Sequence, residues 1–293
     1  MSTDYNLYKI FLYLYEEKSI SKVANLLYVS QPAISYSLKE LENQINSKLF
    51  IRNNKGIVPT KSADKLYKYI KTAFNIISEG ENNVNNDDNI LIKVGAPSHI
   101  SSFCLCPLIN KFKEKYSNVK FEIYTKPTSS IMQMLAYREI DLVIDVYPMT
   151  PKSNTTKVIY LKKLSNCFAY SKKKHSNYSI KSVNDLVKYP LILPSSTSPA
   201  MNDLNKYMID RNINLLSSVN AWTTESIVEL IREGMGVGYF FKDFIRNLED
   251  RNDFEIIEFD GKLPYLQLGI AYCEELLTPI LKEFIDLVCE ENK

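Results

Sequence analysis

The order of apolar runs from Ile90 to the C-terminus constrains the fold more than any other feature of the sequence. Short runs with the pattern of strands alternate there with segments of helical periodicity. A β-α-β-α-β order implies a parallel sheet with helices on both faces. The first expected strands are Ile90–Val94, Val119–Ile123 and Leu142–Ile144, and the first expected helices cover about 98–116 and 129–138.

The same alternation continues to the end of the chain. Further strands are expected at 167–169, 191–193, 218–219, 237–239 and 266–272, with helices from about 199, over 224–233 and over 276–290. Two sub-sheets in one chain place a ligand cleft between them, at the carboxyl ends of their strands. We therefore expect an α/β region of two subdomains, with subdomain I at about 90–162 and 268–293 and subdomain II at about 163–267.

The N-terminal segment predicts three short helices. Residues 5–17 carry apolar side chains at helical spacing. Ser21 is the expected N-cap of a second helix, and Ser30 is the expected N-cap of a third. This third helix runs to about Asn43 and tolerates Pro32, because the first-turn amides have no intrahelical partner. Two short helices joined by a tight turn form a helix-turn-helix.

A short hairpin and a long helix follow. Leu49–Arg52 and Gly56–Val58 flank three polar residues, which predicts a basic wing. Thr60 is the expected cap of a helix that runs to about residue 80, and the polar stretch to residue 89 is the expected hinge. The expected domains are a winged helix-turn-helix at 1–60, a linker helix and hinge at 61–89, and the α/β region at 90–293.

One apolar face of the expected linker helix has the 4, 3, 4 spacing of a heptad seam. Such a seam predicts pairing with a second copy of the chain, although the same face would also suit packing on its own domain. The expected dimerisation residues are Leu66, Ile70, Ala73 and Ile77.

The charge distribution favours a polyanionic partner for the N-terminal part. Residues 18–71 hold ten Lys or Arg and three acids, a net charge of +7, whereas the remaining chain carries −5. A basic module on a mildly acidic body is typical of a head that binds nucleic acid. A plain solvated basic face is the alternative on charge alone.

Several other classes of protein are disfavoured. The longest apolar runs are far shorter than the ~20 residues of a spanning helix, and no signal-peptide pattern opens the chain. The five Cys are scattered and odd in number, which favours reduced thiols and a cytoplasmic location. The 45% of hydrophobic residues excludes a disordered chain.

Catalysis, metals and organic cofactors are not expected. The chain has only two His, and it shows no Ser/His/Asp or paired-carboxylate pattern. Cys104-x-Cys106 lacks the spacing of metal ligands. Gly234-x-Gly236-x-Gly238 ends an expected helix and opens an expected strand, which is the reverse of a dinucleotide fingerprint.

The N-terminal residues resemble the LysR-type transcriptional regulators. The match covers nearly all of residues 1–65 and rests on Ser21, Ala24, Leu26, Ser30–Ser35, Leu38, Leu41-Glu42, Leu49-Phe50, Arg52 and Thr60. The later chain resembles the family's effector-binding domain through Gly95, 139–144, 190–194 and 233–238. The resemblance implies a winged helix-turn-helix, a linker helix and a periplasmic-binding-protein-like effector domain of two subdomains. Lys18 and Asn46 stand where the family often has Gly, and Asn still adopts a left-handed conformation.

The resemblance implies a sequence-specific regulator that binds a double-stranded DNA operator as a homodimer or homotetramer. Its second motif helix would enter the major groove, where Gln31 suits an adenine edge and Lys39 a phosphate or a guanine edge. Simple solvation is the alternative for Gln31, and Lys55 could be a plain surface lysine. The expected DNA-binding residues are Ser21, Ser30, Gln31, Pro32, Ala33, Ser35, Tyr36, Ser37, Lys39, Arg52, Asn53, Asn54 and Lys55.

Three hydroxyl-rich loops predict the effector site. Each follows a strand and precedes a helix, where hydroxyls and free amides bind carboxylate, sulfate or phosphate oxygens. Helix capping alone is the alternative for each loop, and His99 could either add charge or cap. A small, anionic effector between the subdomains is therefore expected. The expected contacts are Ser98, His99, Thr128, Ser129, Ser130, Ser196, Thr197, Ser198 and Thr224.

Three rival functions stay open. A redox-sensing regulator would use Cys104 or Cys167. A solute-binding protein would share the α/β body, but the basic head and missing signal peptide count against it. An enzyme on a similar body is disfavoured because no catalytic set is present.

Overall fold

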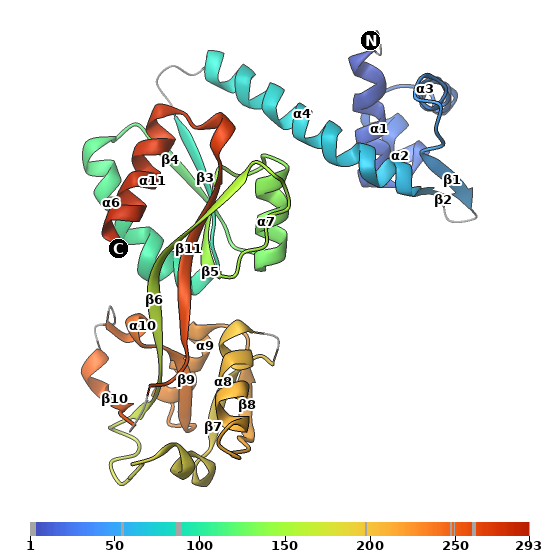
Figure 1. Cartoon of the computed structure of the whole chain (residues 1–293). Coiled ribbons are helices and arrows are strands. Elements are labelled where there is room, and N and C mark those ends of the chain that lie inside the picture. Colours follow the sequence, from blue (N-terminus) through green and yellow to red (C-terminus); the bar gives the residue numbers. More distant parts are fainter. Residues whose placement is uncertain are drawn as a thin grey trace. The chain divides into compact units, whose positions relative to one another are not determined.

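A computed structural model describes residues 4–53, 56–85, 90–196, 198–246, 248, 250–259 and 262–292. The chain divides into two compact units (Figure 1). The N-terminal unit is Met1–Asp87 together with Tyr137–Glu139, and the C-terminal unit is Asp88–Ala136 and Ile140–Lys293.

The N-terminal unit packs four helices and a hairpin around one small core. The elements are α1 (Tyr5–Glu17), α2 (Ile20–Leu26), α3 (Gln31–Gln44), β1 (Phe50–Asn53), β2 (Gly56–Pro59) and α4 (Lys61–Asn85). Phe11 and Leu14 of α1 meet Ile34 and Leu41 of α3 in this core, and all four side chains are fully buried. The expected helix-turn-helix and hairpin are therefore present.

The N-cap of α2 differs from the prediction. Ser19 accepts a hydrogen bond from the Lys22 amide at 3.3 Å and caps the helix, which begins at Ile20. The prediction that Ser21 is the cap was wrong, because Ser19 already has the extended backbone that a cap requires. Lys18 and Asn46 have φ values of 53° and 50°, which explains the family's frequent Gly at both turns.

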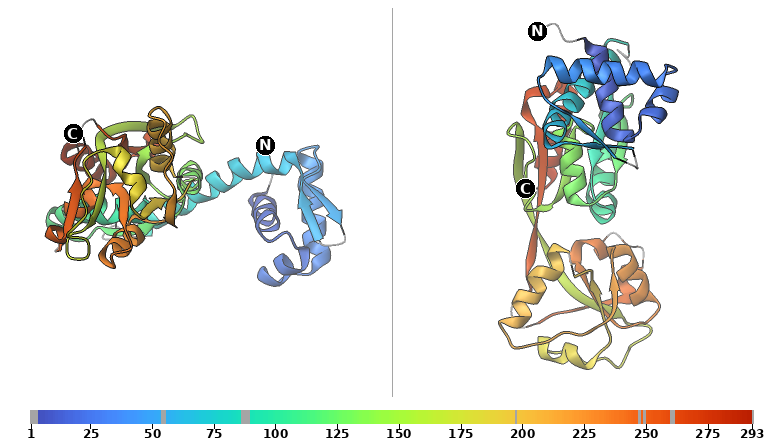
Figure 2. Two further views of the ribbon diagram at one scale, coloured as in Figure 1. Left: turned by 90° about the horizontal axis from the view of Figure 1, so that it is seen from below. Right: turned by 90° about the vertical axis from the view of Figure 1, so that its right-hand side faces the viewer.

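The C-terminal unit is built on one mixed sheet. Its strands are β3 (Leu91–Gly95), β4 (Lys120–Tyr124), β5 (Leu142–Tyr147), β6 (Thr156–Ser171), β7 (Leu191–Pro194), β8 (Ser217–Ala221), β9 (Val237–Phe241), β10 (Phe254–Ile257) and β11 (Tyr265–Cys273). The order is β4-β3-β5-β11-β6-β9-β7-β8, and β10 pairs with β6. The long strands β6 and β11 run through both halves of the unit (Figures 1 and 2).

Strand direction differs between the two halves of the sheet and the strands that join them. β3 pairs in parallel with β4 and β5, and β7 pairs in parallel with β8 and β9. β6 and β11, however, are antiparallel to each other and to their other neighbours β9 and β5. The parallel pairing predicted for the first three strands is confirmed, and two long strands pass in opposite directions between the halves. Their register shifts between Leu268 and Gly269.

The helices of this unit cover both faces of each half of the sheet. In the half that we call subdomain I lie α5 (Ser98–Ile100), a π-helical turn (Ser101–Leu105), α6 (Cys106–Lys115), α7 (Thr128–Ala136) and α11 (Pro279–Glu291). In subdomain II lie 3-10 turns at Val183–Lys188 and Arg251–Asp253 and the helices α8 (Pro199–Ile209), α9 (Thr224–Arg232) and α10 (Lys242–Arg246). The remaining 3-10 turn, Glu274–Leu276, links β11 to α11. α10 and β10 were not expected from the sequence.

The core of the C-terminal unit is continuous across both subdomains on one face. Phe112 of α6 and Phe284 of α11 pack at 5.0 Å between ring centroids, and the same cluster reaches Phe168 of β6 and Leu204 of α8. Gly236 has a φ of +145°, and a Cβ there would overlap the Pro190 carbonyl. Only glycine therefore fits at position 236, in the turn between α9 and β9. This agrees with the expectation that the glycines form a helix-to-strand turn and not a nucleotide-binding loop.

Candidate functional site

The first candidate site is the exposed side of α3 in the N-terminal unit. Ser30 caps α3 by accepting a hydrogen bond from the Ala33 amide at 3.4 Å, and Pro32 lies in the first turn. The side chain of Tyr36 is 71% exposed. Most of the predicted DNA-binding residues lie exposed on α3 or at its start, namely Ser30, Gln31, Pro32, Ala33, Tyr36 and Lys39, while Ser35 and Ser37 are half-buried.

A hydrogen bond joins α3 to the wing. Arg52 of β1 donates from Nη2 to the Ser35 hydroxyl at 3.2 Å. Ser35 therefore helps to hold Arg52 in place on the same side of the unit as α3. Ser21 lies exposed on α2, where its hydroxyl pairs with that of Ser19 at 3.1 Å. Asn53 ends β1, and the predicted contacts Asn54 and Lys55 lie outside the described residues.

A buried carboxylate fixes the position of the wing. Glu42 of α3 accepts hydrogen bonds from the Leu49 amide at 2.8 Å, the Phe50 amide at 3.3 Å and the Lys48 amine at 2.6 Å. Burial alone would raise the pKa of Glu42, but these hydrogen bonds bring the pKa below its usual value. The hairpin is therefore attached to α3 by a charged group and not only by apolar packing.

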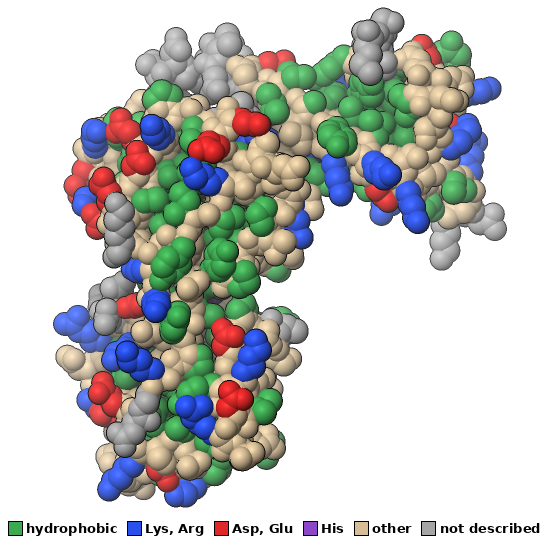
Figure 3. All heavy atoms as spheres, viewed as in Figure 1, with side chains coloured by type: hydrophobic (Ala, Val, Ile, Leu, Met, Phe, Trp, Pro, Cys, Tyr) green, Lys and Arg blue, Asp and Glu red, His purple; other side chains and the backbone are tan. Residues whose placement is uncertain are grey.

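The exposed surface of the N-terminal unit is basic and includes an unpredicted aromatic. Lys and Arg side chains gather on this unit in the face that Figure 3 shows. Tyr28, in the turn before α3, is 96% exposed and has a left-handed φ of 55°. Its exposure could not be read from the sequence, where Tyr28 looks like one more apolar residue of the motif.

The predicted seam of α4 divides into two faces. Leu66 and Ile70 pack partly against the core of their own unit. Ala73 and Ile77 are exposed, as are Tyr69 and Ile76; Tyr69 is 77% and Ile77 42% exposed. Leu66 and Ile70 thus pack on their own domain, which was the alternative to dimerisation for this face. The apolar residues that stay exposed include Tyr69, which was not part of the predicted seam.

The second candidate site is a cavity of about 450 Å³ in the C-terminal unit. Its lining comes from the ends of strands in both subdomains. Five of the predicted effector residues line it, namely Ser98, His99, Thr128, Ser198 and Thr224. Ser129, Ser130 and Ser196 are exposed and are not among the lining residues, and Thr197 lies outside the described residues.

The cavity also includes residues that the sequence reasoning missed. Lys126, Asp145, Trp222 and Phe241 line it, and Trp222 is 82% exposed. Asp145 had a usable signal, because it is a charged residue within a run of buried strand residues. Trp222 and Phe241 became part of the site only through the meeting of β8 and β9 with subdomain I.

Four helix N-termini meet at this cavity. Ser98 begins α5, Thr128 begins α7, Ser198 caps α8 and Thr223 caps α9. Each contributes a residue to the lining. The free backbone amides of a helix start carry partial positive charge, so such positions attract anionic groups.

Two carboxylates of the chain already occupy two of these positions. Asp145 accepts a hydrogen bond from the Thr128 hydroxyl and another from the Val146 amide, both at 2.6 Å. Burial raises the pKa of Asp145 to about 6, although both hydrogen bonds lower it. Glu225, in the first turn of α9, accepts a hydrogen bond from the Ser98 hydroxyl at 3.3 Å.

His99 also lines this cavity, and its buried ring nitrogen makes no hydrogen bond. Its ring stacks on Phe241 at 5.0 Å between centroids, and its Nε2 is buried without a partner. Burial lowers the pKa of His99 to about 4, so the ring is neutral at physiological pH. Together with the bond between Ser98 and Glu225, this stack joins subdomain I to subdomain II across the cavity.

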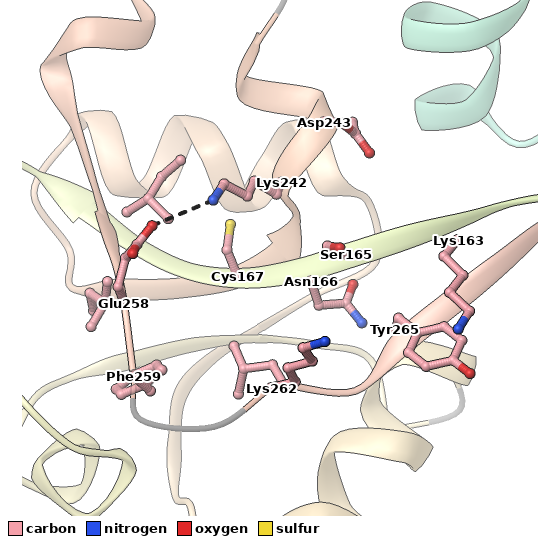
Figure 4. Close-up of a pocket in the computed structure, with 13 residues that line it drawn as sticks. Lys163, Ser165, Asn166, Cys167, Lys242, Asp243, Glu258, Phe259, Lys262 and Tyr265 are labelled. Atoms are coloured by element: carbon pink, nitrogen blue, oxygen red, sulfur yellow. Dashed lines mark ion pairs between the residues drawn. The ribbon is translucent and has the colours of Figure 1, made fainter. Parts of the chain in front are cut away.

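A further hollow of about 680 Å³ lies beside β6 (Figure 4). Figure 4 shows Lys242 and Glu258 pointing toward each other, with 3.7 Å between amine and carboxylate, near Cys167. Burial raises the pKa of Cys167 to about 12, despite Lys242, and that of Cys104 to about 11. Because the thiolate is the reactive form, neither thiol has the environment of a redox sensor.

The described parts of the chain contain no helix long and apolar enough to span a bilayer. In those same ranges no three His, Cys, Asp or Glu side chains are grouped as metal ligands.

Comparison with known families decides the assignment. Residues 5–64 match the bacterial regulatory helix-turn-helix protein, lysR family, and residues 87–293 match the LysR substrate binding domain. The chain belongs to the LysR family of transcriptional regulators. The resemblance seen in the sequence is thereby confirmed, and this LysR-type regulator joins a DNA-binding head to an effector-binding domain.

Relatives of this LysR-type regulator match it along nearly its whole length. It is 26% identical over 293 residues to the uncharacterized HTH-type transcriptional regulator YbdO of Escherichia coli, covering 98% of this chain and 96% of that protein. It is 20% identical over 281 residues to the HTH-type transcriptional regulator YofA of Bacillus velezensis, covering 95% of each.

Solved structures share the fold of the LysR-type regulator. Full-length CbnR complexed with its target DNA has a TM-score of 0.68 at 14% identity, over 99% of this chain and 100% of that one. Full-length OxyR from Pseudomonas aeruginosa has a TM-score of 0.66 at 17% identity, over 99% and 97%.

Proposed function

We propose that this LysR-type regulator reads its operator with α3 and the wing, and that a small molecule in the cavity of the C-terminal unit controls that binding. The cavity carries the proposal, because its lining joins hydroxyls and helix N-termini of both subdomains. A ligand that holds both sides changes DNA binding only if its affinity differs between two arrangements of the protein.

The surface of α3 supports the DNA part of the proposal. Gln31, Tyr36 and Lys39 are exposed on one short stretch of helix, where they would reach base edges and phosphates of a major groove. Arg52, held by Ser35, would add a phosphate or minor-groove contact from the wing. Because the helix-turn-helix family that it matches is one of bacterial DNA-binding regulators, we infer that the protein works in the cytoplasm, and that it acts by binding rather than by catalysis.

The exposed face of α4 supports assembly into a dimer or a tetramer. Tyr69, Ala73, Ile76 and Ile77 leave an apolar strip on a long helix in the described part of the chain. Operator half-sites read by two heads require at least two copies of the chain. A second copy of α4 is the partner whose surface suits this strip.

The cavity supports a ligand with an anionic group. The start of α8 faces it, and Lys126 adds a positive charge. Val146, Ala200 and Ile227 supply apolar walls, so the body of the ligand would be apolar.

One experiment tests the regulatory proposal. The full chain is used to select an operator from random DNA, and a metabolite library is then screened for compounds that change both operator affinity and the fluorescence of Trp222, the single Trp. We expect a hit to change operator affinity by about fivefold or more. Pro127→Phe, at the exposed rim of the cavity, should abolish the response.

Pro151→Phe is the matched control, because Pro151 is exposed and is not among the cavity residues. It should respond like the wild type. Equal responses of both variants would place the effector site elsewhere, and a chain that selects no operator would contradict the DNA part of the proposal.

A further inference from the structure

Two carboxylates of the chain lie at the cavity or beside it, since Asp145 lines it and Glu225 bonds the lining residue Ser98. The Asp145 carboxylate accepts a hydrogen bond from the Thr128 hydroxyl at the start of α7, and the Glu225 carboxylate accepts one from the Ser98 hydroxyl at the start of α5. Three of the four helix N-termini therefore already have a carboxylate of the chain beside them, because Glu225 also lies in the first turn of α9. An incoming carboxylate at any of these places would meet a like charge.

Among the described residues, neither carboxylate has a cationic partner. Asp145 is 1% exposed, and its two hydrogen bonds come from a hydroxyl and a backbone amide. In the described ranges, no Lys or Arg nitrogen lies within 4.0 Å of Asp145 or Glu225. A buried carboxylate without a counter-ion is costly for the fold, which favours a role in binding over a role in stability.

The sheet register brings these groups to one place. Gly95 of β3 lies opposite Val143 of β5 in a parallel pair. Pro97 and Asp145 each lie two residues further along their own strand direction, so they come to the same end of the sheet. Pro97 directly precedes Ser98, which carries the bond to Glu225. The two carboxylates thus flank the start of α5, and the neutral His99 with its unpartnered Nε2 is the next residue along that helix.

The lining also carries a positive charge. Lys126 is the one Lys or Arg among the described lining residues, and α8 adds the Ala200 amide in its first turn, where the Met201 amide is already bound by Ser198. Apolar residues such as Val146, Ile227 and Leu266 lie among the lining. The described cavity residues therefore offer acceptors for a cation, donors for an anion and an apolar surface.

We propose that the effector is amphoteric, of the amino-acid class, with a protonated nitrogen bound by Asp145 and Glu225 and an anionic group bound by Lys126 and the start of α8. The inference rests on the proposed function and specifies its ligand. Ligand binding replaces the contact between Glu225 and Ser98 by contacts of both groups with the ligand, and the unpartnered Nε2 of His99 gains a hydrogen-bonding neighbour.

The test uses matched sets of small molecules on the full chain. The probes are the common amino acids, their N-acetyl derivatives, which lack the cation, and their amides, which lack the anion. Trp222 fluorescence reports binding, because the ring lines the cavity. We expect at least one free amino acid to bind, and its N-acetyl derivative to bind about tenfold to a hundredfold more weakly, as for loss of a charged hydrogen bond.

Variants assign the effect to the two carboxylates. Asp145→Asn and Glu225→Gln should each weaken binding of that amino acid by about tenfold or more, whereas they should leave the N-acetyl derivative nearly unaffected. Glu229→Gln is the matched control, because Glu229 is an exposed acid on the same helix as Glu225 and pairs with Arg232. Circular dichroism checks that each variant is folded. If Asp145→Asn does not fold, Glu225→Gln still tests the proposal.

The outcomes separate this inference from the proposed function. Binding by nitrogen-free acids with no amino acid bound overturns the amphoteric ligand and leaves an effector cavity intact. Absence of binding by every amine in the panel also overturns it. An amino acid that binds through Asp145 and Glu225 without changing operator affinity supports the ligand class and contradicts the regulatory role.

Discussion

Asp145 provides a sharp test of the reasoning, because its carboxylate is buried and has no Lys or Arg partner among the described residues. Its carboxylate is 1% exposed and receives only a hydroxyl and an amide hydrogen bond. Asn has the same shape without the charge. Its carbonyl oxygen still accepts from the Val146 amide, and its amide group donates to the Thr128 hydroxyl. Asp145→Asn should therefore stabilise the free protein at neutral pH, although it weakens ligand binding.

The size of this effect follows from the raised pKa of Asp145. Each tenfold change in an ionisation constant corresponds to about 1.4 kcal/mol. Burial raises the pKa from 3.8 to about 6, so the ionised carboxylate lowers the free energy of unfolding by on the order of 3 kcal/mol. Since the folded pKa lies above the unfolded one, this loss is absent below 3.8, grows as the pH rises toward 6 and is complete above 6.

The assay compares urea unfolding of the full wild-type and variant chains at several pH values. Far-UV circular dichroism follows the whole chain, and Trp222 fluorescence follows the C-terminal unit alone. We expect Asp145→Asn to raise the free energy of unfolding by about 1–3 kcal/mol above pH 6 and by almost nothing near pH 4. His99 and Glu225 are present in both chains, so the difference isolates Asp145.

Asp210→Asn, an exposed carboxylate at the end of α8, serves as the control and should change stability little at any pH. Destabilisation by Asp145→Asn at pH 7.5 would refute the reasoning. It would mean that the bonds from Thr128 and Val146 outweigh the cost of burying the charge.

The other predictions concern pH, DNA and assembly. Affinity for an amine-bearing ligand should fall as the pH drops below about 6, because Asp145 then gains a proton; pH-independent binding from 5 to 8 in a fluorescence titration would contradict this. Gln31→Ala should reduce discrimination between operator and random DNA by about 1–3 kcal/mol, whereas Lys39→Ala should weaken both and reduce the salt dependence measured by anisotropy. A Tyr69→Glu/Ile77→Glu double variant should lower the mass seen by light scattering and weaken operator binding, since both side chains are exposed on α4. An unchanged mass would place the dimer contact elsewhere.

Local patterns were enough to predict most elements of the chain. The helical spacing of residues 5–17 and the Ser30 cap are properties of neighbouring residues, and α1 and α3 form where they were expected. The helix-turn-helix follows because its core, Phe11 with Ile34 and Leu41, comes from residues close in sequence. Single-residue details failed where two candidates competed, as Ser19 and Ser21 did for the cap of α2.

The effector cavity could be predicted only in part. Ser98, Thr128 and Ser198 were found because each stands between a strand and a helix, which is a local signal. Trp222 and Phe241 carry no such signal, and neither does the bond between Ser98 and Glu225, two residues 127 positions apart. Strand direction was also invisible, because the sequence pattern of β6 and β11 is the same in either orientation.

The sequence by itself therefore determined the classes of element, the basic head and the family, since these depend on periodicity, charge and spacing along the chain. Only the tertiary structure decided the charge of the cavity. Whether a hydroxyl at a helix start is free for a ligand depends on which distant carboxylate reaches it first, and folding sets that distance. At Thr128 and Ser98 the chain supplies those carboxylates itself, through Asp145 and Glu225.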